Sequence, residues 1–333
     1  MLTVVENIPE GFLDVDPQRL DEVLRGPTLI HLPGKKARPL FVSVLLHGNE
    51  PTGLMAIQAL LRHYLEQPLP RALSIFVGNV AAASLKQRRL EGQCDYNRIW
   101  QEGDTEAHLM AARVVQEMSE RAPFASIDIH NNTGLNPHYA CINKLDNRFL
   151  RLARLFSRTI VYFTRPEGVQ SMAFSALCPA VTLECGQPGQ AYGAEHAMHF
   201  VQAVLNLEEI DSSALAADEY DLFHTVAVVK VPEALSFGFG VDEVDIEFLR
   251  EIDHYNFREL APGTCFGRIH NPAARLLCQG ECGEDLGAKY FSYQGGRIEL
   301  ATAAMPAMLT LNERVIRQDC FGYLMERLAA PVS

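Results

Sequence analysis

The chain has 333 residues, which is long enough for two domains, and its 48% hydrophobic and 21% charged residues are ordinary for a globular protein. Its 41 acidic residues outnumber the 29 basic ones, and the formal charge of −12 argues against binding to nucleic acid or to an anionic membrane surface. No apolar run approaches the roughly 18 residues that a membrane-spanning helix needs.

The first residues of the chain show neither the basic nor the apolar segment of a secretory signal. The eight cysteines are scattered, and the one close pair, Cys278 and Cys282, has no second pair that would complete a zinc-ribbon spacing. We therefore expect a cytoplasmic protein whose cysteines are reduced.

Strands and helices are predicted to alternate from the start of the chain to about residue 207. A first strand and a short helix at 17–24 are followed by apolar runs, which predict strands, and by amphipathic runs, which predict helices, with a turn at 34–36. The predicted strands are 28–32, 39–46, 72–80, 125–130, 159–163 and 180–184, and the predicted helices are 52–66, 105–121, 147–158, 171–178 and 194–207. This alternation is typical of an α/β fold with a mostly parallel sheet and helices on both faces.

The pattern changes near residues 210–222. Beyond that point, short predicted strands at 225–231, 264–269, 289–293 and 307–311 stand among turns. We therefore predict an α/β domain over residues 1–215, which would hold the functional site, and a smaller C-terminal β-rich domain over residues 222–333.

Two of the predicted strands lead into side chains that can bind a metal. The apolar run 42–46 is followed by His47 and then by Glu50, and the strand 125–130 ends in His130, with Asp128 on the same face. Neighbouring strands of a parallel sheet end at the same edge, so these groups can meet there, and Asp128 could fix the tautomer of the His130 imidazole. Two imidazoles and one carboxylate are the ligands of a catalytic zinc site. Considered alone, each of them could instead cap a turn or serve packing.

A third predicted strand ends in an acid, Glu184. A carboxylate at the end of an apolar strand is desolvated, which raises its pKa. A general base that takes a proton from water needs such a raised pKa. A structural role, the capping of a helix, is the alternative.

Arginines are the candidates for binding a substrate carboxylate, because a guanidinium pairs with a carboxylate through two hydrogen bonds. Arg88 and Arg89 are adjacent, and Arg98 follows Asn97 in the run Asp95-Tyr96-Asn97-Arg98. Solvent exposure is the ordinary alternative, and we expect it for at least one of Arg88 and Arg89.

These motifs carry a family resemblance. His47-Gly48-Asn49-Glu50, Asp95-Tyr96-Asn97-Arg98, His130 and Leu183-Glu184 resemble, in order and rough spacing, the motifs of the succinylglutamate desuccinylase/aspartoacylase family. This family is a branch of the zinc-carboxypeptidase-like (M14) hydrolases, and the resemblance covers about residues 40–205. It implies a zinc-carboxypeptidase-like, mostly parallel mixed sheet followed by a small β domain, which agrees with the change in pattern near residue 220.

The resemblance also implies a metal centre and a reaction. His47, Glu50 and His130 would bind one zinc ion per chain, and Glu184 would be the general base and then the acid. The implied reaction is hydrolysis of the amide bond of an N-acyl amino acid by a metal-activated water, without a covalent enzyme intermediate.

The resemblance assigns the substrate contacts as well. Asn97 and Arg98 would hold the α-carboxylate of the substrate. The family's arginine that stabilises the oxyanion maps to Arg89, with Arg88 as the alternative because the spacing is off by about one residue.

The sequence departs from the family where specificity is decided. Aspartoacylase-type members carry an arginine about ten residues before the general base, which grips a side-chain carboxylate. Here that position is Phe174, and residues 166–184 contain no Lys or Arg. N-acetylaspartate is therefore not expected as the substrate. Tyr290 and Tyr293 are candidates to reach the pocket, as tyrosines of the family's β domain do.

Two other functions stay open. The missing arginine is compatible with an M14-type metallocarboxypeptidase that acts on small peptides, and a non-catalytic metal-binding regulatory protein is the other alternative, although all four metal and base positions are intact. We interpret the rival zinc signal, His196 and His199, as a surface or packing pair, and Cys185 as a small buried residue. The expected partner is a small N-acyl amino acid or peptide rather than nucleic acid or membrane, and a homo-oligomer is compatible with the sequence.

Overall fold

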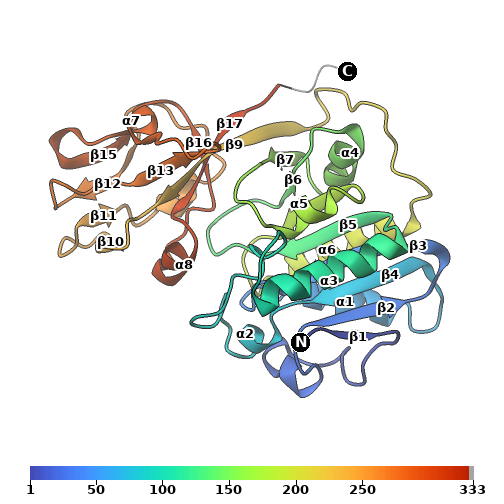
Figure 1. Ribbon diagram of the computed structural model, residues 1–333. Helices are drawn as coiled ribbons and strands as arrows, with labels where there is room; N and C mark the ends of the chain where they lie inside the picture. The colour runs from blue at the N-terminus through green and yellow to red at the C-terminus, as the bar shows by residue number, and fades with distance from the viewer. Residues whose placement is uncertain (330–333) are drawn as a thin grey trace.

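The computed structural model describes residues 1–329, and the last four residues of the predicted β-rich domain lie outside that range. A sheet of twelve strands forms the body of the molecule, and a separate sheet of five strands lies at one end of it (Figure 1). No helix within residues 1–329 is long and apolar enough to cross a membrane.

The bounds of the elements are as follows. The large sheet contains β1 (Thr3–Val5), β2 (Thr28–Leu32), β3 (Gly34–Val44), β4 (Leu69–Val77), β5 (Ala125–His130), β6 (Tyr139–Ile142), β7 (Thr159–Tyr162), β8 (Ala180–Glu184), β9 (Asp221–Lys230), β13 (Leu277–Gly280), β16 (Met305–Ala307) and β17 (Gly322–Arg327). The small sheet contains β10 (Phe237–Phe239), β11 (Ile246–Phe248), β12 (Cys265–Ile269), β14 (Phe291–Ser292) and β15 (Arg297–Leu300). The α-helices are α1 (Thr52–His63), α2 (Val80–Ser84), α3 (Glu106–Arg121), α4 (Asn147–Phe156), α5 (Gln170–Phe174), α6 (Ala191–Asn206), α7 (Gly287–Tyr290) and α8 (Glu313–Gln318).

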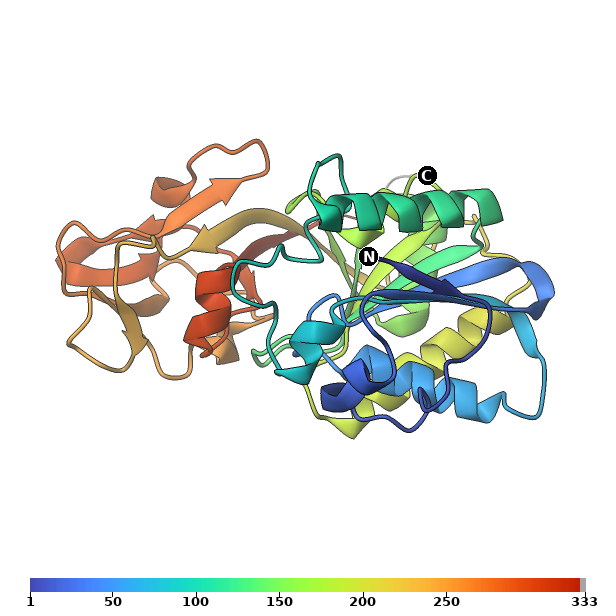
Figure 2. The same ribbon diagram turned by 60° about the horizontal axis from the view of Figure 1, so that its bottom comes forward.

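The central strands of the large sheet are parallel. The sheet has the order β1-β2-β4-β3-β5-β8-β6-β7-β9-β17-β16, and β4, β3, β5 and β8 pair in parallel. Helices α1 and α6 pack together on one face, and α3 crosses the other face (Figures 1 and 2). Strands β5 and β8 are buried along their whole length, as strands covered on both faces must be. The predicted α/β fold, with a mostly parallel sheet and helices on both faces, is confirmed.

The five-stranded sheet has its own apolar core. Its order is β10-β11-β12-β15-β14, and its buried side chains include Phe248, Phe266 and Ile298. A smaller β-rich region therefore follows the α/β body, as predicted. However, β9, β13, β16 and β17 belong to the large sheet, so that this sheet continues past residues 215–222. The division into domains at that point remains a prediction.

The structure differs from the predicted elements where segments are short or partly exposed. Residues 34–36 begin β3 instead of forming a turn, and Gly34 lies so close to β4 that a Cβ atom would stand 2.2 Å from the backbone carbon of Arg71. The predicted strand 289–293 is α7 followed by β14, and the predicted strand 307–311 lies instead at Met305–Ala307. Strands β6, β10 and β17 were not predicted.

Candidate metal centre

Three neighbouring strands bring the predicted site residues to one edge of the large sheet. Strand β3 leads into the loop that carries His47 and Glu50, and β5 and β8 pair so that His130 stands opposite Glu184. Gly48 lets the loop approach α2 closely, because a Cβ atom there would stand 2.3 Å from the backbone of Ala82. The parallel strands and this close contact together hold the four side chains in one place.

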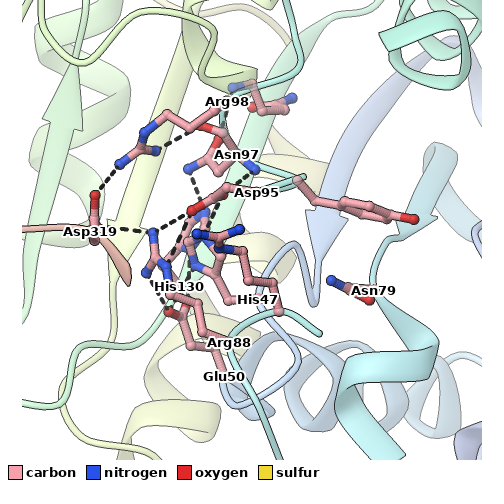
Figure 3. A network of polar contacts seen from close by, with 12 residues as sticks. His47, Glu50, Asn79, Arg88, Asp95, Asn97, Arg98, His130 and Asp319 are labelled. Atoms are coloured by element: carbon pink, nitrogen blue, oxygen red, sulfur yellow. Dashed lines mark hydrogen bonds and ion pairs between the residues drawn. The ribbon is translucent and has the colours of Figure 1, made fainter. Parts of the chain in front are cut away.

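His47, Glu50 and His130 form a compact, buried cluster (Figure 3). One ligand atom from each lies within 4.8 Å of the others. The Nδ1 atom of His47 lies 2.8 Å from Oε1 of Glu50, and the Nδ1 atom of His130 lies 2.7 Å from Oε2 of the same carboxylate. Although burial opposes ionisation, the two imidazoles hold the pKa of the Glu50 carboxyl below its ordinary value.

The outer nitrogens of both imidazoles meet a second pair of carboxylates. Nε2 of His47 lies 3.1 Å from Oδ1 of Asp95, and Nε2 of His130 lies 2.8 Å from Oδ2 of Asp128. Asp128 is in turn fixed by Ser43, whose hydroxyl donates to it over 2.6 Å. An acid at Nε2 keeps a proton on that nitrogen, which would leave the lone pair of Nδ1 for a metal ion when one is bound.

This donor set fits zinc. Two imidazoles and one carboxylate, each imidazole backed by a carboxylate, are the arrangement in which proteins hold a catalytic zinc ion with one open position. Among residues 1–329, this is the one group of three or more His, Cys, Asp or Glu side chains whose ligand atoms lie this close together. The predicted rival is not such a group: His196 stacks on Phe156, with ring centroids 4.3 Å apart, as a packing residue would.

Glu184 lines the same pocket as the cluster and is buried. Its Oε2 atom accepts a hydrogen bond from Nδ2 of Asn132 over 3.3 Å. Burial, opposed by His130 and assisted by the nearby Glu50, raises the pKa of the Glu184 carboxyl to about 8. Such a group can hold and release a proton near neutral pH.

The two adjacent arginines have different surroundings. The Arg88 side chain lies in the pocket, where its guanidinium donates to Asp95 over 3.0 Å and where Nη1 lies 3.8 Å from Oε1 of Glu50. Arg89 does not line the pocket, and its Nη1 donates to the carbonyl oxygen of Gln93 over 2.7 Å. The structure thus places Arg88, and not Arg89, beside the cluster of His47, Glu50 and His130.

Asn97 and Arg98 both line the pocket. The Oδ1 atom of Asn97 accepts a hydrogen bond from the backbone N–H of Gln170 over 3.0 Å, which fixes its amide. Arg98 donates to Oδ1 of Asp319 over 2.9 Å. Asp319 was not predicted as a site residue: it lies 221 positions after Arg98, and no motif marks it. Only the fold brings these two side chains together.

The rest of the pocket wall is mainly apolar and comes from distant parts of the chain. It includes Tyr139, Val161, Phe163, Met308 and Met325. The predicted tyrosines do not reach it: Tyr290 and Tyr293 are absent from the lining, and the hydroxyl of Tyr293 accepts a hydrogen bond from the backbone of Leu276 over 2.9 Å. Tyr139 and Tyr323 line the pocket instead.

The sequence is similar to a known protein family. Residues 36–210 match the family description "Succinylglutamate desuccinylase/Aspartoacylase catalytic domain". No curated protein matches the sequence.

Several solved structures share the fold. A protein titled succinylglutamate desuccinylase/aspartoacylase from Rhodobacter sphaeroides has a TM-score of 0.61 and 14% identity, over 91% of this chain and 88% of its own. The succinylglutamate desuccinylase from Chromobacterium violaceum has a TM-score of 0.58 and 16% identity, over 89% and 87% of the two chains. Murine aminoacylase 3 has a TM-score of 0.55 and 14% identity, over 89% and 98%. At these identities the likeness to the three structures establishes the fold.

Proposed function

Because the chain belongs to the succinylglutamate desuccinylase/aspartoacylase family, we propose that it is a zinc-dependent hydrolase that cleaves the amide bond of an N-acyl amino acid. The observation that carries this proposal is the cluster of His47, Glu50 and His130 next to the buried Glu184. A zinc ion held by the cluster would act as a Lewis acid on the scissile carbonyl and lower the pKa of a water to about 7.

Glu184 moves the protons of the proposed reaction. Its carboxylate takes a proton from the attacking water and then gives it to the leaving amine. Burial raises the pKa of the Glu184 carboxyl in the metal-free chain, which makes its carboxylate a stronger base than an exposed one. Asn132 orients the carboxylate through its hydrogen bond to Oε2.

Arg88, Asn97 and Arg98 orient the substrate. Arg88 stands beside the cluster, where its guanidinium can donate to the oxygen that becomes negative in the transition state. Asn97 and Arg98 line the same pocket and would hold the α-carboxylate of the substrate.

One observation favours a second candidate, a metallocarboxypeptidase that acts on small peptides. Phe174, at the position of the aspartoacylase-type arginine, is fully buried and stacks on Phe41 with ring centroids 4.2 Å apart. It contributes no charge to the pocket, so that nothing at this position grips an acyl carboxylate.

Metal analysis combined with a substrate panel tests the proposed function. We expect protein purified without added metal to contain about one zinc per chain and to release free amine from one or more N-acyl amino acids. Hydrolysis of dipeptides alone would favour the peptidase, and absence of metal would contradict both. Zinc without turnover of any substrate would favour a binding protein.

The neighbours Arg88 and Arg89 form a matched pair for testing the oxyanion role. Replacing Arg88 by alanine is expected to lower kcat by about 10²–10³-fold, the usual cost of removing one oxyanion donor. Replacing Arg89 by alanine should change kcat by less than about threefold, because its guanidinium binds a loop carbonyl outside the pocket. Steady-state kinetics of both variants decide the point, with melting temperatures as the control for folding. Similar losses in both, or a larger loss for Arg89→Ala, would refute the role of Arg88.

A further inference from the structure

The strands beyond β8 continue the face of the large sheet that carries Glu184. Glu184 of β8 pairs with Tyr139 of β6. Cys141, two residues after Tyr139, pairs with Val161 of β7. Residues that pair across two strands lie on the same face of a sheet, and so do residues two positions apart along one strand. Tyr139, Cys141 and Val161 therefore extend one face of the sheet away from the proposed general base.

These residues belong to an apolar strip in the pocket. The apolar strip consists of Tyr139, Cys141, Val161, Phe163 and Met325, all of which line the pocket. Four of them are at most 7% exposed, and Phe163 is half-buried. Burial raises the pKa of the Cys141 thiol and of the Tyr139 hydroxyl well above their ordinary values, so that the strip is uncharged at neutral pH. Such a surface favours contact with apolar groups.

The apolar strip is also long. It runs from β6 to β17, and the strand order β8-β6-β7-β9-β17 contains four steps from one strand to the next. Because neighbouring strands lie about 4.8 Å apart, these steps correspond to about 19 Å along the sheet. An acetyl group covers little of such a surface. A longer or branched apolar group would cover more of it, and each CH₂ group that it buries strengthens binding by up to about fourfold.

The cations of the pocket are assigned elsewhere. In the proposed reaction, Arg88 serves the oxyanion, Arg98 the α-carboxylate and the zinc ion the scissile carbonyl. Within residues 1–329, Arg165 is the one further Lys or Arg of the lining. Its side chain is 43% exposed, and its Nη1 lies 2.8 Å from Oε1 of Glu167. A second carboxylate of the substrate would therefore lose its hydration on the apolar strip without gaining a free cation.

We propose that the apolar strip binds an apolar substituent of the substrate, so that the enzyme prefers N-acyl amino acids with an apolar acyl group or side chain over those with an acidic one. This inference rests on the proposed function and names the substrate class of the same site. The α-carboxylate stays with Asn97 and Arg98, and the group that reaches the strip is apolar. An acyl group and a side chain share this chemistry.

Two pairs of ligands with matched shapes test the proposal. N-acetylleucine and N-acetylaspartate differ in the side chain, where an isopropyl group stands in place of a carboxylate. N-(4-methylpentanoyl)alanine and N-succinylalanine differ in the same way in the acyl group. Calorimetry in the presence of zinc, on Glu184→Gln to prevent turnover, gives the four dissociation constants. We expect the apolar member of at least one pair to bind at least about tenfold more tightly than the acidic member. The pair that shows this preference identifies whether the strip receives the side chain or the acyl group.

A lysine in the apolar strip should weaken or reverse the preference. Phe163→Lys, made in the same Glu184→Gln background, places a cation beside the ligand. The ratio of the two dissociation constants in the discriminating pair should then shift by at least about tenfold towards the acidic member. The control is Tyr162→Lys, which adds the same charge one position earlier, at a residue that does not line the pocket. Its ratio should stay within about threefold of the original.

A preference below about tenfold in both pairs would overturn the proposal, and so would failure of all four ligands to bind. Equal shifts in the two lysine variants would overturn it as well. If Phe163→Lys does not fold, the two pairs decide alone on the protein without this substitution. Failure of the proposed function is seen separately, when ligands bind but the protein with Glu184 intact releases no amine from them.

Discussion

Replacing Glu184 by glutamine is expected to lower kcat by about 10²–10⁴-fold, the usual contribution of a general base, and to leave the zinc content unchanged. Glutamine keeps the shape of the side chain and can still pair with Asn132, but it cannot accept or return a proton. The measurement is steady-state hydrolysis of whichever N-acyl compound the panel identifies, together with metal analysis of the same preparation. If the variant keeps more than about a tenth of the original kcat, Glu184 is not the general base.

The same substitution has a consequence for stability that does not depend on turnover. In the metal-free chain, burial raises the pKa of the Glu184 carboxyl from 4.5 to about 8. The unfolded chain therefore loses this proton at a lower pH than the folded chain, and stability falls as the pH rises from about 4.5 through 8. Glutamine has no proton to lose. Without metal, the melting temperature of Glu184→Gln minus that of the original protein should therefore increase as the pH rises from 5 to 8. If this difference stays the same over that range, the raised pKa of Glu184 is contradicted.

The convergence of the candidate metal ligands could be predicted from the sequence because these residues stand at the ends of apolar strands. His130 and Glu184 are the last residues of β5 and β8, and His47 and Glu50 follow β3 within one loop. Once these strands are taken as neighbours in a parallel sheet, the convergence of the side chains follows from the topology. The pairing of His130 with Glu184 in the sheet bears this out.

The far side of the pocket could not be predicted in this way. Asp319 reaches Arg88 across 231 positions of sequence, and Met325 reaches the apolar wall from β17, a strand that extends the large sheet by antiparallel pairing with β9. Neither position lies in a motif, and such long-range contacts follow from strand order, which local periodicity does not contain. The sequence could not show which of Arg88 and Arg89 enters the pocket for a similar reason: both side chains have the same chemistry, and only the backbone direction of the loop decides.

Replacing Glu50 by glutamine is expected to reduce the zinc content from about one per chain to less than about a tenth, and hydrolysis with it. The carboxylate of Glu50 lies within 2.8 Å of both Nδ1 atoms, so that its loss removes a ligand, the one negative charge in the centre and the acceptor shared by His47 and His130. Metal analysis after dialysis gives the content. The rise in melting temperature on addition of zinc reports the affinity independently of activity, because a ligand that binds only the folded chain stabilises it by RT ln(1 + [L]/Kd).

Glu184→Gln is the matched control for this experiment. Both substitutions turn a buried glutamate of the same pocket into glutamine, and each parent residue is 5% exposed. If the cluster binds the metal and Glu184 carries the proton, the two variants must separate: Glu50→Gln loses zinc and with it hydrolysis, whereas Glu184→Gln loses hydrolysis and retains zinc. Full zinc content in Glu50→Gln would show that this cluster does not hold the metal. Loss of zinc in both variants would make Glu184 a fourth ligand. The general base would then have to be another acid, and Asp319 is the one acid besides Glu50 and Glu184 that lines the pocket within residues 1–329.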